Sequence, residues 1–305
     1  MYNCDICFII LHYITTEETD ICVDSIIKKI DTPNYKIVIV DNASPNNSGE
    51  ILQNKHKDNE KIHVIRSKEN LGFARGNNLG YDYAKKHFSP KFIAFLNNDT
   101  YLIQDNFFHV IEDEYNKSNF AVLGPMIMTP YEDSGKCNPK RTSPITINEL
   151  NKFERKNRIL LFLNKICLDL VYIRFIKFLR EFLIKSPLKN VIFKKRPGFI
   201  PDYSTRMENV QLHGCCLIMS PVFIEKYDGF DNRTFLYMEE DLLYINMLKD
   251  NMLMVYNPEL KIFHSEEITS TKVAGGKRKK RSFKYRNLLK SVDIVKKTLE
   301  TYESK

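Results

Sequence analysis

Short apolar runs alternate with longer amphipathic segments through the first hundred residues. Buried strands are predicted by apolar, β-branched runs at residues 6–11, 36–40, 63–65 and 92–96. Helices are predicted between the first three runs, at residues 17–30 and 50–57. Connections of this length join parallel strands through a crossover helix. The pattern therefore predicts an α/β fold, with a mostly parallel central sheet flanked by helices.

Polar side chains directly follow two of the predicted strands. Asp41 ends the run KIVIVD, and Asn97-Asn98-Asp99 follows the run FIAFL. An open α/β sheet collects ligands outside the carboxyl ends of its strands, so these side chains are expected to meet one ligand. Taken alone, each has a simpler use, because Asp and Asn after a strand often cap a turn or a helix.

A glycine-bearing segment from Glu69 to Asn78 is expected to be a loop that leads into a helix through Ala84. Gly72 and Gly76 would permit close approach of the backbone, and the amides at the helix start would be available to an anion. A glycine-bearing loop alone is weak support for phosphate binding.

The later part of the chain places polar groups beside further predicted elements. A strand over residues 213–219 would be entered through Gly214, and Glu240-Asp241 would open a helix after a GFD turn. His264 follows an apolar run at residues 260–263. Simpler uses exist here too, since acids stabilise the first turn of a helix and a histidine beside a strand is commonly an ordinary hydrogen-bonding residue.

Taken in order, the motifs DNAS, NLGFARGNN, LNND, GFD and EED resemble those of the family 2 glycosyltransferases of the GT-A fold, through residues 4–130 and 210–265. The resemblance implies a nucleotide-diphosphate sugar as donor, linked to UDP or dTDP. The donor-binding residues that it implies are Tyr13, Asp41, Asn42, Gly72, Arg75, Gly76, Asn77, Asn97, Asn98 and Asp99. The acceptor-binding residues that it implies are His213, Gly214 and Glu239.

The resemblance also implies how the reaction would run. Asp241, with Glu240 beside it, would take the proton of an acceptor hydroxyl during an inverting transfer. Asp99 and His264 would hold Mg²⁺ or Mn²⁺ against the diphosphate. Asn97 stands where the family motif D-x-D has its first acid, so metal dependence is expected to be weaker than with two acids. The acceptor would be a saccharide or a lipid-linked hydroxyl.

Basic residues concentrate in the middle of the chain, where they suit an anionic partner. The net charge is +8, and residues 152–196 hold thirteen Lys and Arg against three acids. One apolar stripe at helical spacing is predicted from Leu160, Cys167, Leu168, Val171, Phe175, Phe178, Leu179 and Phe182. Such a helix suits an anionic membrane surface. Packing on the catalytic part, or in a homodimer, remains the alternative.

These patterns divide the chain into residues 1–135 for the nucleotide sugar, a basic helical insertion at 136–200, an acceptor-side half at 201–270, and a basic loop and helix at 271–305. The basic run at residues 275–281 suits a loop that closes over the donor, a solvated charge run or membrane contact. The seven cysteines show no repeated metal-binding spacing, and reduced thiols are expected.

The sequence lacks a standard signal peptide and a stretch of 18 uncharged apolar residues, so neither secretion nor a membrane span is expected. The predicted location is the cytoplasm, peripheral on the inner face of the cell membrane. Two other function classes stay open. One is a nucleotidyltransferase acting on a sugar phosphate, and the other is a noncatalytic basic protein that binds membrane or nucleic acid. For the leading hypothesis no nucleic-acid partner is expected.

Overall fold

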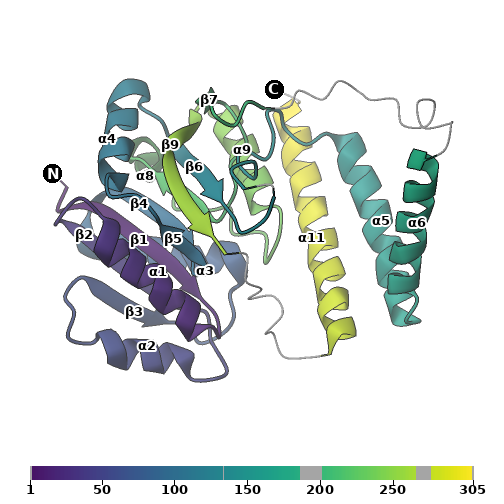
Figure 1. Cartoon of the computed structure of the whole chain (residues 1–305), viewed down its shortest axis with the longest axis horizontal. Coiled ribbons are helices and arrows are strands. Elements are labelled where there is room, and N and C mark those ends of the chain that lie inside the picture. The colour runs from purple at the N-terminus through teal and green to yellow at the C-terminus, as the bar shows by residue number, and fades with distance from the viewer. Residues whose placement is uncertain (1, 133, 186–200, 266–275, 304–305) are drawn as a thin grey trace.

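The structure is a computed structural model that describes residues 2–132, 134–185, 201–265 and 276–303. A sheet with covering helices forms one part of the molecule, and three long helices stand beside it (Figure 1). The strands are β1 (Cys4–His12), β2 (Tyr35–Asp41), β3 (Ile62–Arg66), β4 (Pro90–Asn97), β5 (Thr100–Leu102), β6 (Val122–Met128), β7 (Met207–Glu208), β8 (Cys216–Met219) and β9 (Met254–His264).

The sheet has the order β3-β2-β1-β4-β8-β6-β9-β5, and β7 also pairs with β9. β1 to β4 pair in parallel, in agreement with the prediction for the first hundred residues. The second half is mixed, because β8 lies antiparallel between β4 and β6, while β6 and β9 pair in parallel. The sheet as a whole is therefore less parallel than the sequence predicts.

The covering helices are α1 (Thr16–Lys29), α2 (Ser48–His56), α3 (Gly72–Phe88), α4 (Phe107–Ser118), α8 (Pro221–Lys226) and α9 (Glu239–Lys249). β1 is apolar from Ile6 to Leu11 because both faces of the sheet are covered. Ile6 and Phe8 pack in a cluster with residues of α1 and α4, whereas Cys7 and Ile9 pack with residues of α3, α8 and α9. A strand buried on both faces reads as a continuous apolar run, which made it easy to predict.

Helix α3 begins earlier than the sequence predicts, at Gly72, so most of the expected loop is helical. Its glycines let the helix lie close to the sheet. A Cβ on Gly76 would stand 2.7 Å from Leu11 Cδ1, and one on Gly80 would stand 2.6 Å from Ile9 Cγ2. The glycine pattern thus serves helix-to-sheet packing at positions 76 and 80.

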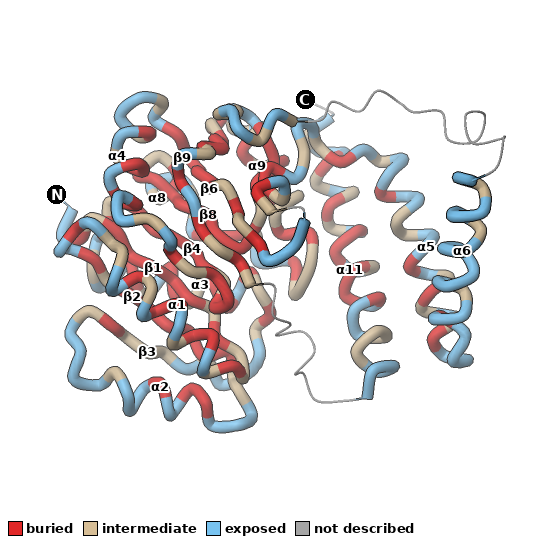
Figure 2. Tube along the Cα trace, viewed as in Figure 1, coloured by how far each residue is buried: buried red, intermediate tan, exposed pale blue. Residues whose placement is uncertain are grey.

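The three long helices are α5 (Ile147–Lys165), α6 (Asp169–Lys185) and α11 (Lys277–Glu303). The predicted single stripe is wrong in one respect, because it is divided between α5 and α6. Cys167 has a φ of 61°, and the amide of Leu168 donates to the Leu163 carbonyl at 2.8 Å, which ends α5. Neither Gly nor Pro marks this break in the sequence. Leu160 is buried, whereas most other stripe residues are exposed (Figure 2).

Asp169 ties these three helices together at the start of α6. Its fully buried carboxylate accepts hydrogen bonds from Asn164 Nδ2 at 3.1 Å, Arg281 Nη2 at 3.1 Å and Tyr285 Oη at 3.3 Å. The donors belong to α5 and α11, so one acid anchors the first turn of α6 to both neighbours.

We expect Asp169→Asn to lower the free energy of unfolding by about 2 kcal/mol, because the Arg281 guanidinium loses its charged acceptor. Urea unfolding followed by circular dichroism measures this change. Asp293→Asn, an exposed acid on α11, is the matched control and should leave the midpoint unchanged. Equal midpoints for both variants would contradict the anchoring role of Asp169.

Among the described residues, no helix is long and apolar enough to cross a membrane.

Cys4 and Cys7 are buried free thiols, as expected from their place in a strand.

Candidate active site at the ends of the strands

Asp99 and His264 meet at the carboxyl ends of β4 and β9. The pairing of β5 with β9 sets Thr100 opposite His264, which brings the imidazole to the preceding residue, Asp99. His264 Nε2 lies 3.2 Å from Asp99 Oδ1, and both side chains are buried. His264 Nδ1 is also buried and makes no hydrogen bond within the described part of the chain. A buried nitrogen without a hydrogen-bond partner is unusual, and a bound ligand would supply the missing partner here.

The segment from His213 to Cys215 connects this pair to the start of α9. The Cys215 carbonyl accepts a hydrogen bond from the Asn97 amide at 2.9 Å, and the His213 ring lies 5.8 Å from the His264 ring. On the other side, the Gly214 amide donates to Glu240 Oε1 at 3.2 Å. The ends of β4 and β9 and the first turn of α9 therefore converge on three consecutive residues.

Gly214 leaves room for the Glu240 side chain, which would have to shift if position 214 carried a Cβ. A Cβ on Gly214 would lie 2.9 Å from Glu240 Oε1. The family resemblance implied an acceptor-binding role for Gly214. In the structure Gly214 contacts Glu240, which precedes the expected base, Asp241.

Lys140 is a site residue that the sequence analysis missed. Its Nζ lies 2.7 Å from Glu240 Oε1, and its amide donates to the Gln211 carbonyl at 2.8 Å. The neighbouring Asn138 accepts a hydrogen bond from the His213 amide at 3.0 Å. Residues 138–141 thus lie with the acceptor-side half, and the helical part of the predicted insertion starts only at Ile147. A single lysine in a loop carries no signal that would have revealed this.

The acids at the start of α9 have different protonation behaviour. Burial, and then the charge of Glu240, raises the pKa of Asp241 to about 6, although a hydrogen bond from Gln211 and the charge of Arg141 oppose the rise. Burial and the same Glu240 charge raise the pKa of Glu239 to about 7. Two acids that titrate near neutrality in one turn are typical of a site that transfers protons.

Glu240 differs from its neighbours because a cation faces it. Burial works against its ionisation, but the Lys140 ammonium holds the pKa of Glu240 below its usual value. Burial, followed by the charge of Lys140, lowers the pKa of His213 to about 3, so this ring is neutral at pH 7. Glu240 therefore remains a carboxylate, paired with Lys140, beside the more easily protonated Asp241.

The residues just before α9 adopt an uncommon backbone conformation. Tyr237 and Met238 have φ values of 76° and 68°, in the left-handed region that favours glycine. The Phe235 carbonyl accepts a hydrogen bond from the Phe73 amide at 2.8 Å, and a Cβ on Gly72 would lie 2.0 Å from that carbonyl oxygen. Gly72 therefore lets the segment before α9 dock on the start of α3, which joins the two halves of the sheet region.

Asp41 and Asn42 lie where β2 ends, as predicted. Asp41 is buried, accepts a hydrogen bond from the Ser44 amide at 3.0 Å and lies 3.7 Å from Arg66 Nε. The Asn42 side chain accepts from the Leu71 amide at 2.8 Å and donates to the Gly72 carbonyl at 3.0 Å. Asn42 thus fastens the segment that starts α3, and Asp41 closes the turn after β2.

The remaining predicted donor residues are spread around the ends of β1 and β4. Asn98 Nδ2 donates to Thr15 Oγ1 at 2.7 Å, next to the half-buried Tyr13. Asn77 donates to the Phe73 carbonyl at 3.0 Å within α3, whereas Arg75 on the same helix is exposed. Arg75 is thus free to reach a ligand, but Asn77 and Gly76 face the protein.

His12 at the end of β1 was also missed. Its ring is buried between α1 and α2, with Nδ1 2.7 Å from Thr19 Oγ1 and Nε2 2.8 Å from Ser48 Oγ. Burial lowers its pKa to about 4, although Asp41 opposes the shift. A neutral, doubly hydrogen-bonded histidine is best explained as a support for the β1 and β2 ends.

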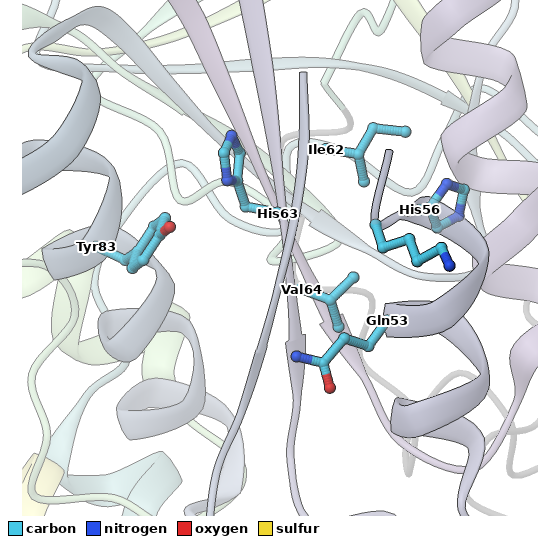
Figure 3. A pocket seen from close by; sticks show the side chains of 7 residues that line it. Gln53, His56, Ile62, His63, Val64 and Tyr83 are labelled. Atoms are coloured by element: carbon cyan, nitrogen blue, oxygen red, sulfur yellow. The ribbon is translucent and has the colours of Figure 1, made fainter. Parts of the chain in front are cut away.

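A shallow hollow of about 280 Å³ lies elsewhere, at the β3 edge of the sheet (Figure 3). It is lined by Gln53, His56, Lys57, Ile62, His63, Val64 and Tyr83. None of the predicted site residues lines it. The convergence of polar groups, rather than this hollow, identifies the candidate site.

The sheet order and the covering helices match the GT-A fold of nucleotide-sugar glycosyltransferases, and this confirms the predicted fold class. The chain belongs to the family described as Glycosyl transferase family 2, whose model matches residues 7–183.

Similarity to individual proteins is more limited. TuaG of Bacillus subtilis (strain 168), named as a glycosyltransferase of teichuronic acid biosynthesis, is 34% identical over 67 residues, which are 22% of this chain and 25% of TuaG. GalNAc-T7, solved with UDP, GalNAc and Mn²⁺, has a TM-score of 0.56 at 13% identity. The matched region covers 87% of this chain and 44% of the GalNAc-T7 chain. S. aureus TarS 1–349 with UDP-GlcNAc has a TM-score of 0.50 at 14% identity, and the matched region covers 90% of this chain and 60% of the TarS chain. The chain thus spans less than two thirds of each of these proteins.

Proposed function

We propose that this protein is an inverting glycosyltransferase that moves a sugar from a nucleotide-diphosphate donor to a hydroxyl of a saccharide or lipid-linked acceptor. The observation that carries the proposal is the link between the Asp99–His264 pair and the Glu240-Asp241 pair through residues 213–215. A donor group and an acceptor group can react only if both are held at one place, and this segment lies between them.

Asp241 acts as the general base in this proposal. Its pKa of about 6 lets it be ionised at neutral pH and yet remain basic enough to accept a hydroxyl proton. Glu240 is held by Lys140 and the Gly214 amide, so it fixes the turn and keeps a negative charge beside Asp241. Glu239, in the same turn, and His213, beside it, are the acceptor-contacting residues in this proposal.

Asp99 and His264 are the residues that would hold a divalent ion. His264 Nε2 is adjacent to Asp99 Oδ1, and His264 Nδ1 has no hydrogen-bond partner among the described residues, which is consistent with a site that is completed on ligand binding. Within the described ranges no group of three or more His, Cys, Asp or Glu side chains gathers as a metal site, so further ligands would come from the donor and water. When bound, Mg²⁺ or Mn²⁺ would neutralise charge on the leaving diphosphate. A carboxylate with an imidazole favours Mn²⁺ over Mg²⁺.

The donor is proposed to be a UDP-linked hexose derivative. TarS was solved with UDP-GlcNAc and GalNAc-T7 with UDP, and TuaG is named for teichuronic acid synthesis, so a UDP donor and a surface polysaccharide acceptor fit this chain better than dTDP-rhamnose. Arg75, exposed at the start of α3, is the cation among the predicted donor residues and is proposed to bind the donor's phosphates.

Product analysis separates this proposal from a nucleotidyltransferase. The protein is incubated with UDP-GlcNAc, Mn²⁺ and a saccharide acceptor in one reaction, and with UTP and a sugar 1-phosphate in another. Release of UDP in the first reaction supports sugar transfer. Release of pyrophosphate in the second, without UDP in the first, would overturn it. A purely binding protein would release neither product.

The rate is expected to rise with pH and to reach a plateau above about pH 7, with a midpoint near 6, because Asp241 with its raised pKa must lose its proton to act as a base. Lys140→Met should move this midpoint upward, because loss of a nearby cation makes protonation of the carboxylates easier. Lys140→Arg, which keeps the cation, should restore it. The check is a pH–rate profile of UDP release, and identical profiles for the wild type and Lys140→Met would contradict the role of Lys140.

A further inference from the structure

Helix α6 carries an apolar surface that the described part of the protein leaves in solvent. Five residues at the start of this helix and along it follow one another at spacings of three and four and form what we call the α6 stripe. Its members, with their exposed fractions, are Leu168 47%, Val171 60%, Phe175 56%, Phe178 63% and Phe182 63%. Side chains of this size are normally buried, and a continuous exposed apolar row marks an interaction surface.

Cations border the α6 stripe. Arg174 lies one turn from Val171 and Phe178, and Lys185 lies one turn from Phe182. Arg174, Lys185 and the more distant Arg180 are exposed, and Lys177 pairs with Glu181 at 3.9 Å. The helix surface therefore combines a row of aromatic and aliphatic groups with an excess of positive charge.

The basic start of α11 extends this surface. Arg278 Nη1 lies 2.9 Å from Cys167 Sγ, and Arg281 binds Asp169 at the start of α6. Lys277 and Lys279 are exposed in the same first turn. Cations at the start of a helix are unfavourable next to its positive dipole end, so an anionic partner would relieve this arrangement.

We infer that the α6 stripe and the basic start of α11 form the surface through which this protein lies on an anionic lipid bilayer. The apolar row would enter the boundary between headgroups and acyl chains, and the flanking cations would bind lipid phosphates. A second copy of the chain fits less well. Packing the α6 stripes of two copies against each other would bring the cations Arg174 and Lys185 of both copies close together, where they would repel. Binding through this surface does not depend on the proposed transfer reaction.

The chain contains no tryptophan, which gives a direct test in the full-length protein. Phe178→Trp would place a single fluorophore in the α6 stripe. Ile51→Trp, at a position 54% exposed on α2, is the matched control on a helix remote from α6 in Figure 1. Both variants are mixed with vesicles of phosphatidylcholine and phosphatidylglycerol, and with vesicles of phosphatidylcholine alone.

The expected result is a blue shift of the Phe178→Trp emission with the anionic vesicles, which added salt reduces and which Ile51→Trp does not show. The combined variant Phe175→Ser, Phe178→Ser and Phe182→Ser should lower vesicle affinity at least about tenfold in flotation and leave thermal unfolding unchanged, since these side chains are exposed. No shift for the position 178 probe, or equal shifts for both probes, would overturn the inference. So would a lipid-independent shift that grows with protein concentration and accompanies a doubled mass in light scattering, which would assign the surface to a second copy.

Discussion

Asp241→Asn should lower the rate of UDP release by about 10²- to 10⁴-fold, the usual contribution of a positioned general base. Asparagine has nearly the same shape and keeps a hydrogen-bond acceptor for Gln211, which contacts Asp241 in the native turn. It cannot accept the acceptor's proton. The binding of UDP-GlcNAc, measured by calorimetry, should therefore change little while turnover collapses.

The control for this variant is Asp113→Asn, an exposed acid on α4, which should keep the native rate. Circular dichroism and thermal unfolding show whether Asp241→Asn is folded. A folded variant that retains more than about a tenth of the native rate would remove Asp241 from the role of base. In that case Glu239, whose raised pKa is about 7, becomes the next residue to substitute.

The first half of the sheet could be predicted from sequence because its strands are covered on both faces. Continuous apolar runs then coincide with β1, β2 and β4, and the polar residues that end them mark the edge where ligands bind. Asp41 and Asp99 were found in this way. The strand β6 escaped prediction, because VLGPMIM carries a glycine and a proline that resemble a turn.

Other features depend on contacts between distant segments, which a single sequence does not encode locally. Lys140 reaches Glu240 across one hundred residues through a loop with no pattern of its own. The break between α5 and α6 occurs at Cys167 without glycine or proline. Helical periodicity runs through that break, so the stripe was interpreted as one helix, although its first member, Leu160, is buried and most of its later members are exposed.

The acidic turn of α9 could be recognised from sequence, but its chemistry could not. Three consecutive acids at a helix start are expected for capping alone. Their chemistry is decided by burial, by Lys140 and by the Gly214 amide, which hold Glu240 ionised while Asp241 and Glu239 titrate at higher pH. Identical residue types thus acquire different roles from their surroundings.

Asp99→Asn is expected to abolish the stabilisation of the protein by UDP-GlcNAc with Mn²⁺ and to lower UDP release by about 10²-fold or more. The reason is that Asp99 supplies the one carboxylate beside His264 among the described residues, and a neutral amide binds a hard cation much less tightly. The thermal shift is measured with the nucleotide sugar in the presence of Mn²⁺ and again with EDTA. The native protein should lose its shift in EDTA, whereas Asp99→Asn should show no shift in either condition.

Asp105→Asn provides the control, because Asp105 lies just beyond β5, is 79% exposed and pairs with Lys29. It should keep the full Mn²⁺-dependent shift. His264→Gln should weaken the metal dependence less than Asp99→Asn, since Asp99 remains as a charged ligand. If Asp99→Asn kept the Mn²⁺-dependent shift while its unliganded unfolding temperature stayed native, the cation would have to bind elsewhere. The Asp99–His264 contact would then be a structural link between β5 and β9, and Arg75 would become the first candidate to neutralise the diphosphate.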